Sequence, residues 1–99
     1  MIVVNRNDNC IKIEGHAHYA EPGKDIVCAG ISALVQNLIQ SIEELTTDKI
    51  QYDMSPGKVD IYFRNLSEHA QLLVDSFFVG IHLIADNYPN NVTVQALNT

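Results

Sequence analysis

Hydrophobic and polar residues alternate with a period of two in four short segments of the chain. The segments are residues 10–14, 50–54, 59–64 and 92–96. In residues 10–14, for example, Ile11 and Ile13 are separated and followed by charged residues. Because successive side chains of a strand point to opposite faces, this pattern predicts four strands, each with one face buried. The short apolar run of residues 2–4 predicts a fifth strand.

Two longer segments repeat apolar residues at intervals of three, four and seven, which is typical of a helix with one buried face. The first runs from Asp25 to about Leu45, and the second, capped by Ser67, reaches about Asp86. The second helix also has apolar residues outside its main stripe. These are Leu72, Phe78 and Val79. Such a helix is either buried on more than one side or in contact with a partner. A second copy of the chain would account for the excess, so we expect a homodimer.

Turn-forming residues separate the strands. Residues 5–9 and 55–57 are rich in Asn, Asp, Ser, Pro and Gly, which predicts two hairpins. The order strand, strand, helix, strand, strand, helix, strand then predicts an α+β fold. We expect a two-layer sandwich in which two helices pack on one face of a five-stranded sheet, leaving the other face polar. The 99 residues are expected to form a single domain, residues 1–99.

Composition narrows the choice of partners. The net charge of −6 argues against direct binding to nucleic acid and is compatible with a basic protein partner. Polar residues in the first helix argue against a membrane span, and we expect no signal peptide. The two cysteines are therefore expected to stay reduced in a cytoplasmic protein, with Cys10 structural.

Candidate chemistry is concentrated in residues 15–32. If Asp25 is the helix N-cap, Cys28 falls at position N3, where the helix dipole favours a thiolate. His16 lies twelve positions earlier, where a strand gives way to a loop. A Cys–His pair in this environment is an activated nucleophile. The alternative is that Cys28 is a small buried hydrophobe and His16 a turn residue.

The loop between them contains three further candidates. His18 would point away from His16 in an extended backbone, and it is either merely exposed or in contact with substrate. Tyr19 either packs the loop onto the body of the protein or covers the site. Gly23, which follows Pro22, suggests a conformationally special turn, and a mobile lid is one hypothesis.

Two residues of the helix have alternative supporting roles. Asp25 either orients His16 or only caps the helix. Ser32 lies four residues after Cys28, on the same helix face, where it could donate a hydrogen bond near the sulfur or bond to its own backbone. For an oxyanion, the backbone N–H groups of the first helical turn are the expected donors.

These residues also form a recognisable signature. It consists of Gly15-His16-Ala17, Tyr19-Ala20, Gly23, Asp25-Ile26-Val27-Cys28-Ala29 and Ser32. It closely resembles that of the bacterial ribosomal-processing cysteine protease family, Prp. The resemblance implies a small cytoplasmic endopeptidase that removes an N-terminal extension from a large-subunit ribosomal protein, cleaving after an aromatic residue. It makes His16 and Cys28 the catalytic residues. Gly30 stands where many members have Ala.

Two other functions are compatible with the same residues. One is a non-catalytic module for ribosome assembly, in which His16 and Cys28 serve only structure. The other is a metal site built from His16, His18 and Cys28 with Asp25 or Glu21, although zinc requires a more rigid spacing than a glycine loop supplies. We expect no metal and no cofactor.

Overall fold

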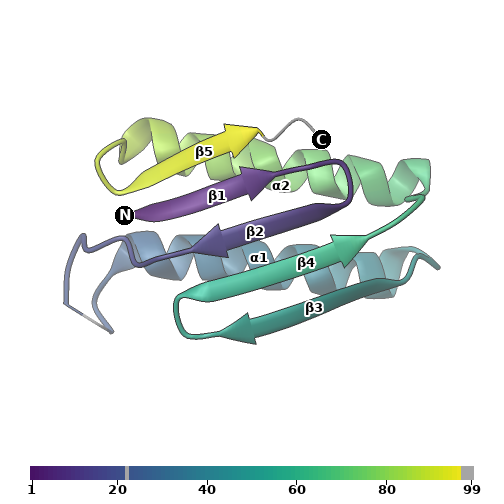
Figure 1. Ribbon diagram of the computed structural model, residues 1–99, viewed down its shortest axis with the longest axis horizontal. Coiled ribbons are helices and arrows are strands. Elements are labelled where there is room, and N and C mark those ends of the chain that lie inside the picture. The colour runs from purple at the N-terminus through teal and green to yellow at the C-terminus, as the bar shows by residue number, and fades with distance from the viewer. Residues whose placement is uncertain (22, 97–99) are drawn as a thin grey trace.

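Five strands form one mixed sheet, and both helices lie against the same face of it (Figure 1). The protein is described by a computed structural model that covers residues 1–21 and 23–96. The elements are β1 (Ile2–Arg6), β2 (Cys10–Glu14), α1 (Ile26–Leu45), β3 (Ile50–Ser55), β4 (Lys58–Phe63), α2 (Glu68–Asn87) and β5 (Val92–Ala96). The predicted α+β class and element order are confirmed.

The strand order in the sheet is β3-β4-β2-β1-β5. Neighbouring strands are antiparallel except β1 and β5, which are parallel, with Ile2 opposite Val92. The turn between β3 and β4 therefore lies beside the end of β2, and the Gly15 N–H donates to the Gly57 carbonyl over 2.9 Å. This bond joins the start of the long loop that precedes α1 to the β3–β4 turn.

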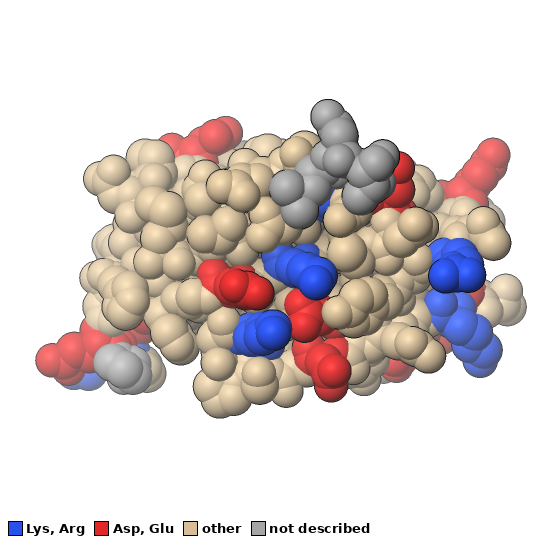
Figure 2. Space-filling view, in the orientation of Figure 1, with Lys and Arg blue, Asp and Glu red and all other residues tan. Residues whose placement is uncertain are grey.

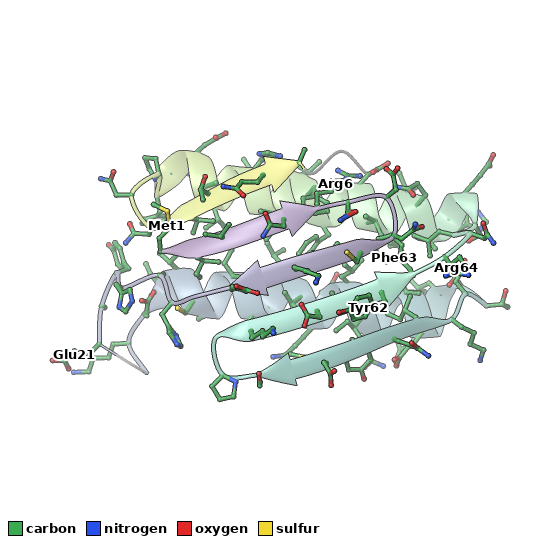
Figure 3. The ribbon with its side chains drawn as sticks, viewed as in Figure 1. Met1, Arg6, Glu21, Tyr62, Phe63 and Arg64 are labelled. Carbon is green, nitrogen blue, oxygen red and sulfur yellow. The ribbon has the colours of Figure 1, made fainter. Side chains whose placement is uncertain are left out.

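The core lies between the sheet and the helices. Its most completely buried large side chains are Val4, Ile11, Val27, Val35, Ile42, Ile61, Val74 and Ile81. The opposite sheet face is polar, and Figure 2 shows charged side chains gathered over its middle. Alternation along β4 explains the difference, since Tyr62 is exposed whereas its neighbour Phe63 is buried (both labelled in Figure 3).

The two helices approach each other closely at two glycines. A Cβ added at Gly30 of α1 would lie 3.2 Å from Ile84 Cδ1 of α2. Conversely, a Cβ added at Gly80 of α2 would lie 3.0 Å from both Cδ atoms of Leu34 on α1. Each glycine thus lies against a branched side chain of the other helix, and the contact is tighter at Gly80 than at Gly30.

The apolar excess on α2 is smaller than the sequence pattern predicted. Phe78 was expected outside the main stripe, but it is only 2% exposed and the Arg6 guanidinium lies 4.3 Å from its ring centroid. Phe78 is therefore buried within the chain itself, because the end of β1 covers this part of α2. Leu72, Val79 and Leu83 are exposed.

Helix α1 is long and apolar enough to cross a membrane, judged by length and composition alone. It has the pattern of a core helix in this fold, because one side of it is buried. The buried residues are Val27, Ile31, Val35, Leu38, Ile39 and Ile42. A core helix passes the same test of length and hydropathy as a membrane span, so this finding is weak evidence for a membrane.

Candidate active site

Asp25 caps α1 as predicted. Its Oδ1 atom accepts hydrogen bonds from the backbone N–H groups of Val27 and Cys28, both at 3.0 Å. Cys28 is therefore at position N3, in the first turn of the helix. The pKa of Asp25 lies below its ordinary value of 3.8. The hydrogen bond from the Cys28 N–H is the largest cause, and partial desolvation of the carboxylate acts in the opposite direction.

The same carboxylate also holds the loop. Its Oδ2 atom accepts the N–H groups of Tyr19 at 3.0 Å and Ala20 at 3.3 Å, and these bonds lower the pKa of Asp25 further. Within the described residues, Asp25 has no hydrogen bond to His16. Of the two roles left open for Asp25, the structure therefore shows the cap, together with a clamp on the loop that was not anticipated.

The sulfur of Cys28 receives a backbone donor from the loop. The Ala17 N–H lies 3.4 Å from Sγ, and Ala17 itself is only 2% exposed. By contrast, the N–H groups of Val27 and Cys28 are already bound to Asp25. These two N–H groups of the first helical turn are therefore occupied, and the Ala17 N–H is the backbone donor recorded at the Cys28 sulfur.

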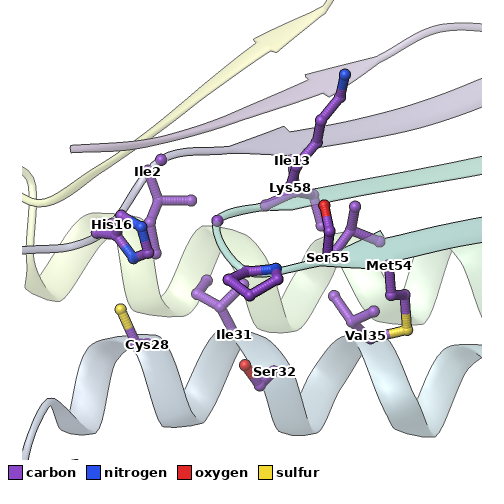
Figure 4. A pocket seen from close by; sticks show the side chains of 14 residues that line it. Ile2, Ile13, His16, Cys28, Ile31, Ser32, Val35, Met54, Ser55 and Lys58 are labelled. Atoms are coloured by element: carbon purple, nitrogen blue, oxygen red, sulfur yellow. The ribbon is translucent and has the colours of Figure 1, made fainter. Parts of the chain in front are cut away.

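His16 lies at the start of the loop, on the same cavity as Cys28. Figure 4 shows the Cys28 sulfur directed toward the His16 ring. The ring also contacts the β3–β4 turn, because a Cβ added at Gly57 would lie 2.8 Å from its Nε2 atom. The described residues include no hydrogen bond between the His16 ring and Sγ, so in this state packing and the backbone position the ring.

Two cavities meet at this pair. One, of about 210 Å³, extends between α1 and the β3–β4 hairpin and has several apolar walls (Figure 4). These walls include Ile31, Val35, Met54 and Val59. The other, of about 480 Å³, is lined by loop residues including His18, Ala20 and Gly23. His16, Cys28 and Ser32 line both, so a bound chain could pass across the pair from one cavity to the other.

The β3–β4 hairpin is the part of the site that sequence reasoning missed. Alternation placed Met54 and Val59 on an apolar face, and Gly57 in a turn, but local patterns contain no information on which loop such a turn will meet. The signal in the sequence was the glycine at position 57. In the structure, Gly57 has a φ of +73° and lies close to the His16 ring.

The remaining loop candidates lie around the pair. His18 is exposed, and its backbone is left-handed, with a φ of +54°. The extended backbone that would direct His18 away from His16 is therefore not present. The centroids of the two imidazole rings are 6.0 Å apart. Tyr19 packs edge-to-face on Tyr88, with centroids 5.1 Å apart, and so attaches the loop to the end of α2. Glu21 lies at the outer tip of the loop (Figure 3).

Two other predictions in this region have partial outcomes. Gly23 has the positive φ of a special turn, +85°, whereas Pro22 lies outside the described residues. Ser32 is exposed beside the pair, and within the described part of the chain it has no hydrogen bond to the sulfur.

Metal binding has little support in the geometry. Across residues 1–21 and 23–96, no group of three or more His, Cys, Asp and Glu side chains is arranged to hold a metal ion. Both carboxylate oxygens of Asp25 are occupied by backbone N–H groups. Cys10 and Cys28 are both free thiols.

A cysteine in the first turn of a helix, on one cavity with a histidine of the preceding loop, is an arrangement typical of cysteine-dependent hydrolases. Comparison with known families agrees with that class. The chain belongs to the cysteine protease Prp family, whose model matches residues 1–93.

Similar proteins are known from several bacteria. The ribosomal processing cysteine protease Prp of Staphylococcus aureus is 34% identical over 86 residues, which are 84% of this chain and 81% of that protein. Prp of Mycoplasma genitalium is 31% identical over 97 residues, 96% and 95% of the two chains. The crystal structure of Prp from S. aureus with a covalently linked product peptide superposes with a TM-score of 0.93 at 27% identity, covering 98% of this chain and all of that one.

Proposed function

We propose that this protein is an endopeptidase of a single domain in which Cys28 is the nucleophile and His16 the general base. The observation that carries the proposal is that Sγ of Cys28, in the first turn of α1, is directed toward the His16 ring on a shared cavity. A helix N-terminus stabilises negative charge on the sulfur, and an adjacent imidazole can take its proton.

The reaction proceeds in two halves. His16 takes the Cys28 thiol proton as Sγ bonds to the scissile carbonyl carbon, and the oxygen becomes an oxyanion. The C–N bond then breaks, His16 gives its proton to the leaving amine, and a thioester remains on Cys28. Water deprotonated by His16 attacks the thioester, which releases the new carboxyl terminus and returns the proton to Sγ. The Ala17 N–H is the donor nearest to this charge.

The substrate we propose is a large-subunit ribosomal protein with an N-terminal extension, cleaved after an aromatic residue in the cytoplasm. Support comes from the names of the relatives and from two features of this chain. The net charge of −6 suits a basic protein. The cavity of about 210 Å³ beside Cys28 has room for a ring, since an apolar cavity of about 150 Å³ accepts benzene.

Cleavage of a basic peptide with a single internal phenylalanine tests this proposal. We expect a cut after the phenylalanine, lost in Cys28→Ala and reduced at least about 10³-fold in His16→Ala. Replacing the phenylalanine by alanine should lower kcat/KM about 10- to 100-fold, because a buried ring contributes about 1.5 to 3 kcal/mol.

Matched controls exist for both residues. Cys10→Ala removes the other thiol, and His69→Ala removes an exposed imidazole on α2; both should retain full activity. If Cys28→Ala still cleaves the peptide, the nucleophile is assigned wrongly. If the wild-type protein binds the peptide and never cuts it, a non-catalytic binding module replaces the protease as the better description.

We also propose that the protein is a homodimer. Leu72, Val79 and Leu83 lie on one side of α2 and are exposed in the single chain. Covering them with a second copy would remove apolar area from water.

A further inference from the structure

The turn between α2 and β5 reaches into the active-site loop through one side chain. Asn91 Nδ2 donates a hydrogen bond of 2.8 Å to the Ala17 carbonyl, although the two residues are 74 positions apart. The backbone of Asn91 is itself held on both sides. Its N–H donates to the Tyr88 carbonyl at 2.9 Å, and its carbonyl accepts from the Ile2 N–H at 2.8 Å. Asn91 therefore presents its amide from a well-anchored position.

Ala17 is the residue that Asn91 holds, and it lies between His16 and His18. Both of its backbone polar groups are engaged, the carbonyl with Asn91 and the N–H with Cys28 Sγ at 3.4 Å. Its side chain is buried in the core cluster. A single short segment thus connects the Asn91 amide to the nucleophile.

The backbone next to this bond is in an uncommon conformation. His18, whose amide shares the peptide unit of the Ala17 carbonyl, has a φ of +54°. Residues other than glycine persist in the left-handed region only where the surroundings hold them there, and such residues are concentrated at functional sites. The hydrogen bond from Asn91 holds the carbonyl oxygen of this same peptide unit.

We propose that Asn91 is a positioning residue for the nucleophile: by holding the Ala17 carbonyl, it keeps the Ala17 N–H directed at Cys28 Sγ. A donor aimed at the sulfur favours the thiolate over the thiol. Asn91 does not touch the substrate in this role and acts only through Ala17. The inference rests on the proposed role of Cys28 as the nucleophile.

The pH dependence of Cys28 alkylation by iodoacetamide tests this role, measured from pH 5 to 9 in a Cys10→Ser background. In Asn91→Ala we expect the pH profile of the alkylation rate to move by about one pH unit toward alkaline pH. On the acidic side of the profile, the alkylation rate should therefore be about tenfold lower, whereas the limiting rate at alkaline pH should be unchanged. Asn91→Asp, which keeps the shape but replaces the donor with a carboxylate, should shift it at least as far. Asn90→Ala, an exposed neighbour of the same type, should leave it unchanged.

A second measurement does not depend on reactivity. Hydrogen exchange of the Ala17 amide should become at least about tenfold faster in Asn91→Ala, because its carbonyl is released. The Tyr19 amide, which is bound to Asp25, is the internal control and should keep its rate. A merely structural role would accelerate both amides or neither.

The outcomes separate this inference from the proposed function. If folded Asn91 variants keep the wild-type profile while His16→Ala shifts it, the role of Asn91 is refuted and the protease assignment stands. If Cys28 of the wild-type protein alkylates with the profile of an unstructured cysteine peptide, both proposals fail. Unchanged exchange at Ala17 in Asn91→Ala also refutes the role of Asn91.

Discussion

At the scale of single residues, one carboxylate organises the loop between β2 and α1. Asp25 binds two N–H groups of α1 through Oδ1 and two of the loop through Oδ2. This arrangement joins the helix that presents Cys28 to the loop that presents His16. The sequence indicated the cap, because capping depends on neighbours two and three positions along the chain. It did not indicate the clamp, which depends on the path of the loop between β2 and α1.

The contact between Gly57 and His16 predicts a specific loss of activity. In Gly57→Ala the new Cβ would lie 2.8 Å from His16 Nε2, so the ring must move. We expect peptide cleavage to fall about 10- to 100-fold, since misplacing a reacting group by about 1 Å has an effect of this size.

Gly23→Ala is the matched control for this substitution. Gly23 also has a positive φ, +85°, but a Cβ there would meet nothing within 4 Å. Both variants should lose about 1 to 2 kcal/mol of stability from backbone strain, measured by urea unfolding. Equal activities in the two variants would contradict the role assigned to the Gly57 contact.

At the scale of elements, the α1–α2 interface depends on the two small residues Gly30 and Gly80. Each lies against a branched side chain of the other helix. Glycine in a helix is unfavourable on local grounds, by about 0.5 to 1 kcal/mol relative to alanine. The close approach of the two helices accounts for Gly80, where a Cβ would meet both methyl groups of Leu34, whereas at Gly30 a Cβ would meet only the terminal methyl of Ile84.

The two glycines should respond differently to alanine. In Gly30→Ala only the terminal methyl of Ile84 must shift, by a few tenths of an ångström, so the helix gain should dominate and stability should rise by up to about 1 kcal/mol. In Gly80→Ala both methyl groups of Leu34 must move, and we expect a loss of about 1 to 3 kcal/mol. Urea unfolding of both variants tests this; a loss at Gly30 as large as that at Gly80 would contradict it.

At the scale of the whole molecule, three carboxylates connect different elements and loops of the fold. Asp25 ties the loop to α1, Asp48 binds Ser67 at the start of α2, and Asp75 pairs with Arg6 of β1 at 2.7 Å. Hydrogen bonds to these partners lower the pKa of each below its ordinary value of 3.8. Each therefore stabilises the fold only while it is ionised.

The sign of the pH dependence follows from these shifts. A carboxyl whose pKa is lower in the folded state contributes stability above its unfolded pKa, and that contribution is lost as the pH falls through the folded value. We expect the Tm to decrease on acidification below about pH 4 for this reason.

Asp48→Asn provides the test of this acid sensitivity. It should lower the Tm at pH 7 and make the decrease between pH 4 and pH 2 shallower, because one ionisation no longer contributes. Asp8→Asn, in the exposed β1–β2 turn, serves as the control and should leave the slope unchanged. A slope in Asp48→Asn equal to that of the wild type would contradict the contribution of Asp48.

The proposed homodimer gives a prediction at the same scale. Light scattering after size exclusion should give twice the chain mass of 11.0 kDa, and Val79→Glu should reduce this to the mass of one chain. Gln36→Glu adds the same charge on the exposed face of α1 and should leave the mass doubled. A Val79→Glu protein that stays dimeric would place the interface elsewhere.

The sequence by itself determined the seven elements, the caps of both helices and the position of Cys28 in the first turn of α1. These features depend on residues at most a few positions apart, whose periodicity and capping chemistry act along the chain. Because these local patterns act only along the chain, the sequence indicated His16 and Cys28 as candidate residues but did not indicate which other residues surround them.

Only the tertiary structure decided which distant residues meet. The strand order, the parallel pairing of β5 with β1, the contact of Gly57 with His16 and the bond from Asn91 to Ala17 all join segments far apart in sequence. The left-handed backbone of His18 belongs with them, because its neighbouring carbonyl is held by a residue more than 70 positions away. Such contacts result from packing the helices on the sheet, and local sequence patterns do not specify that packing.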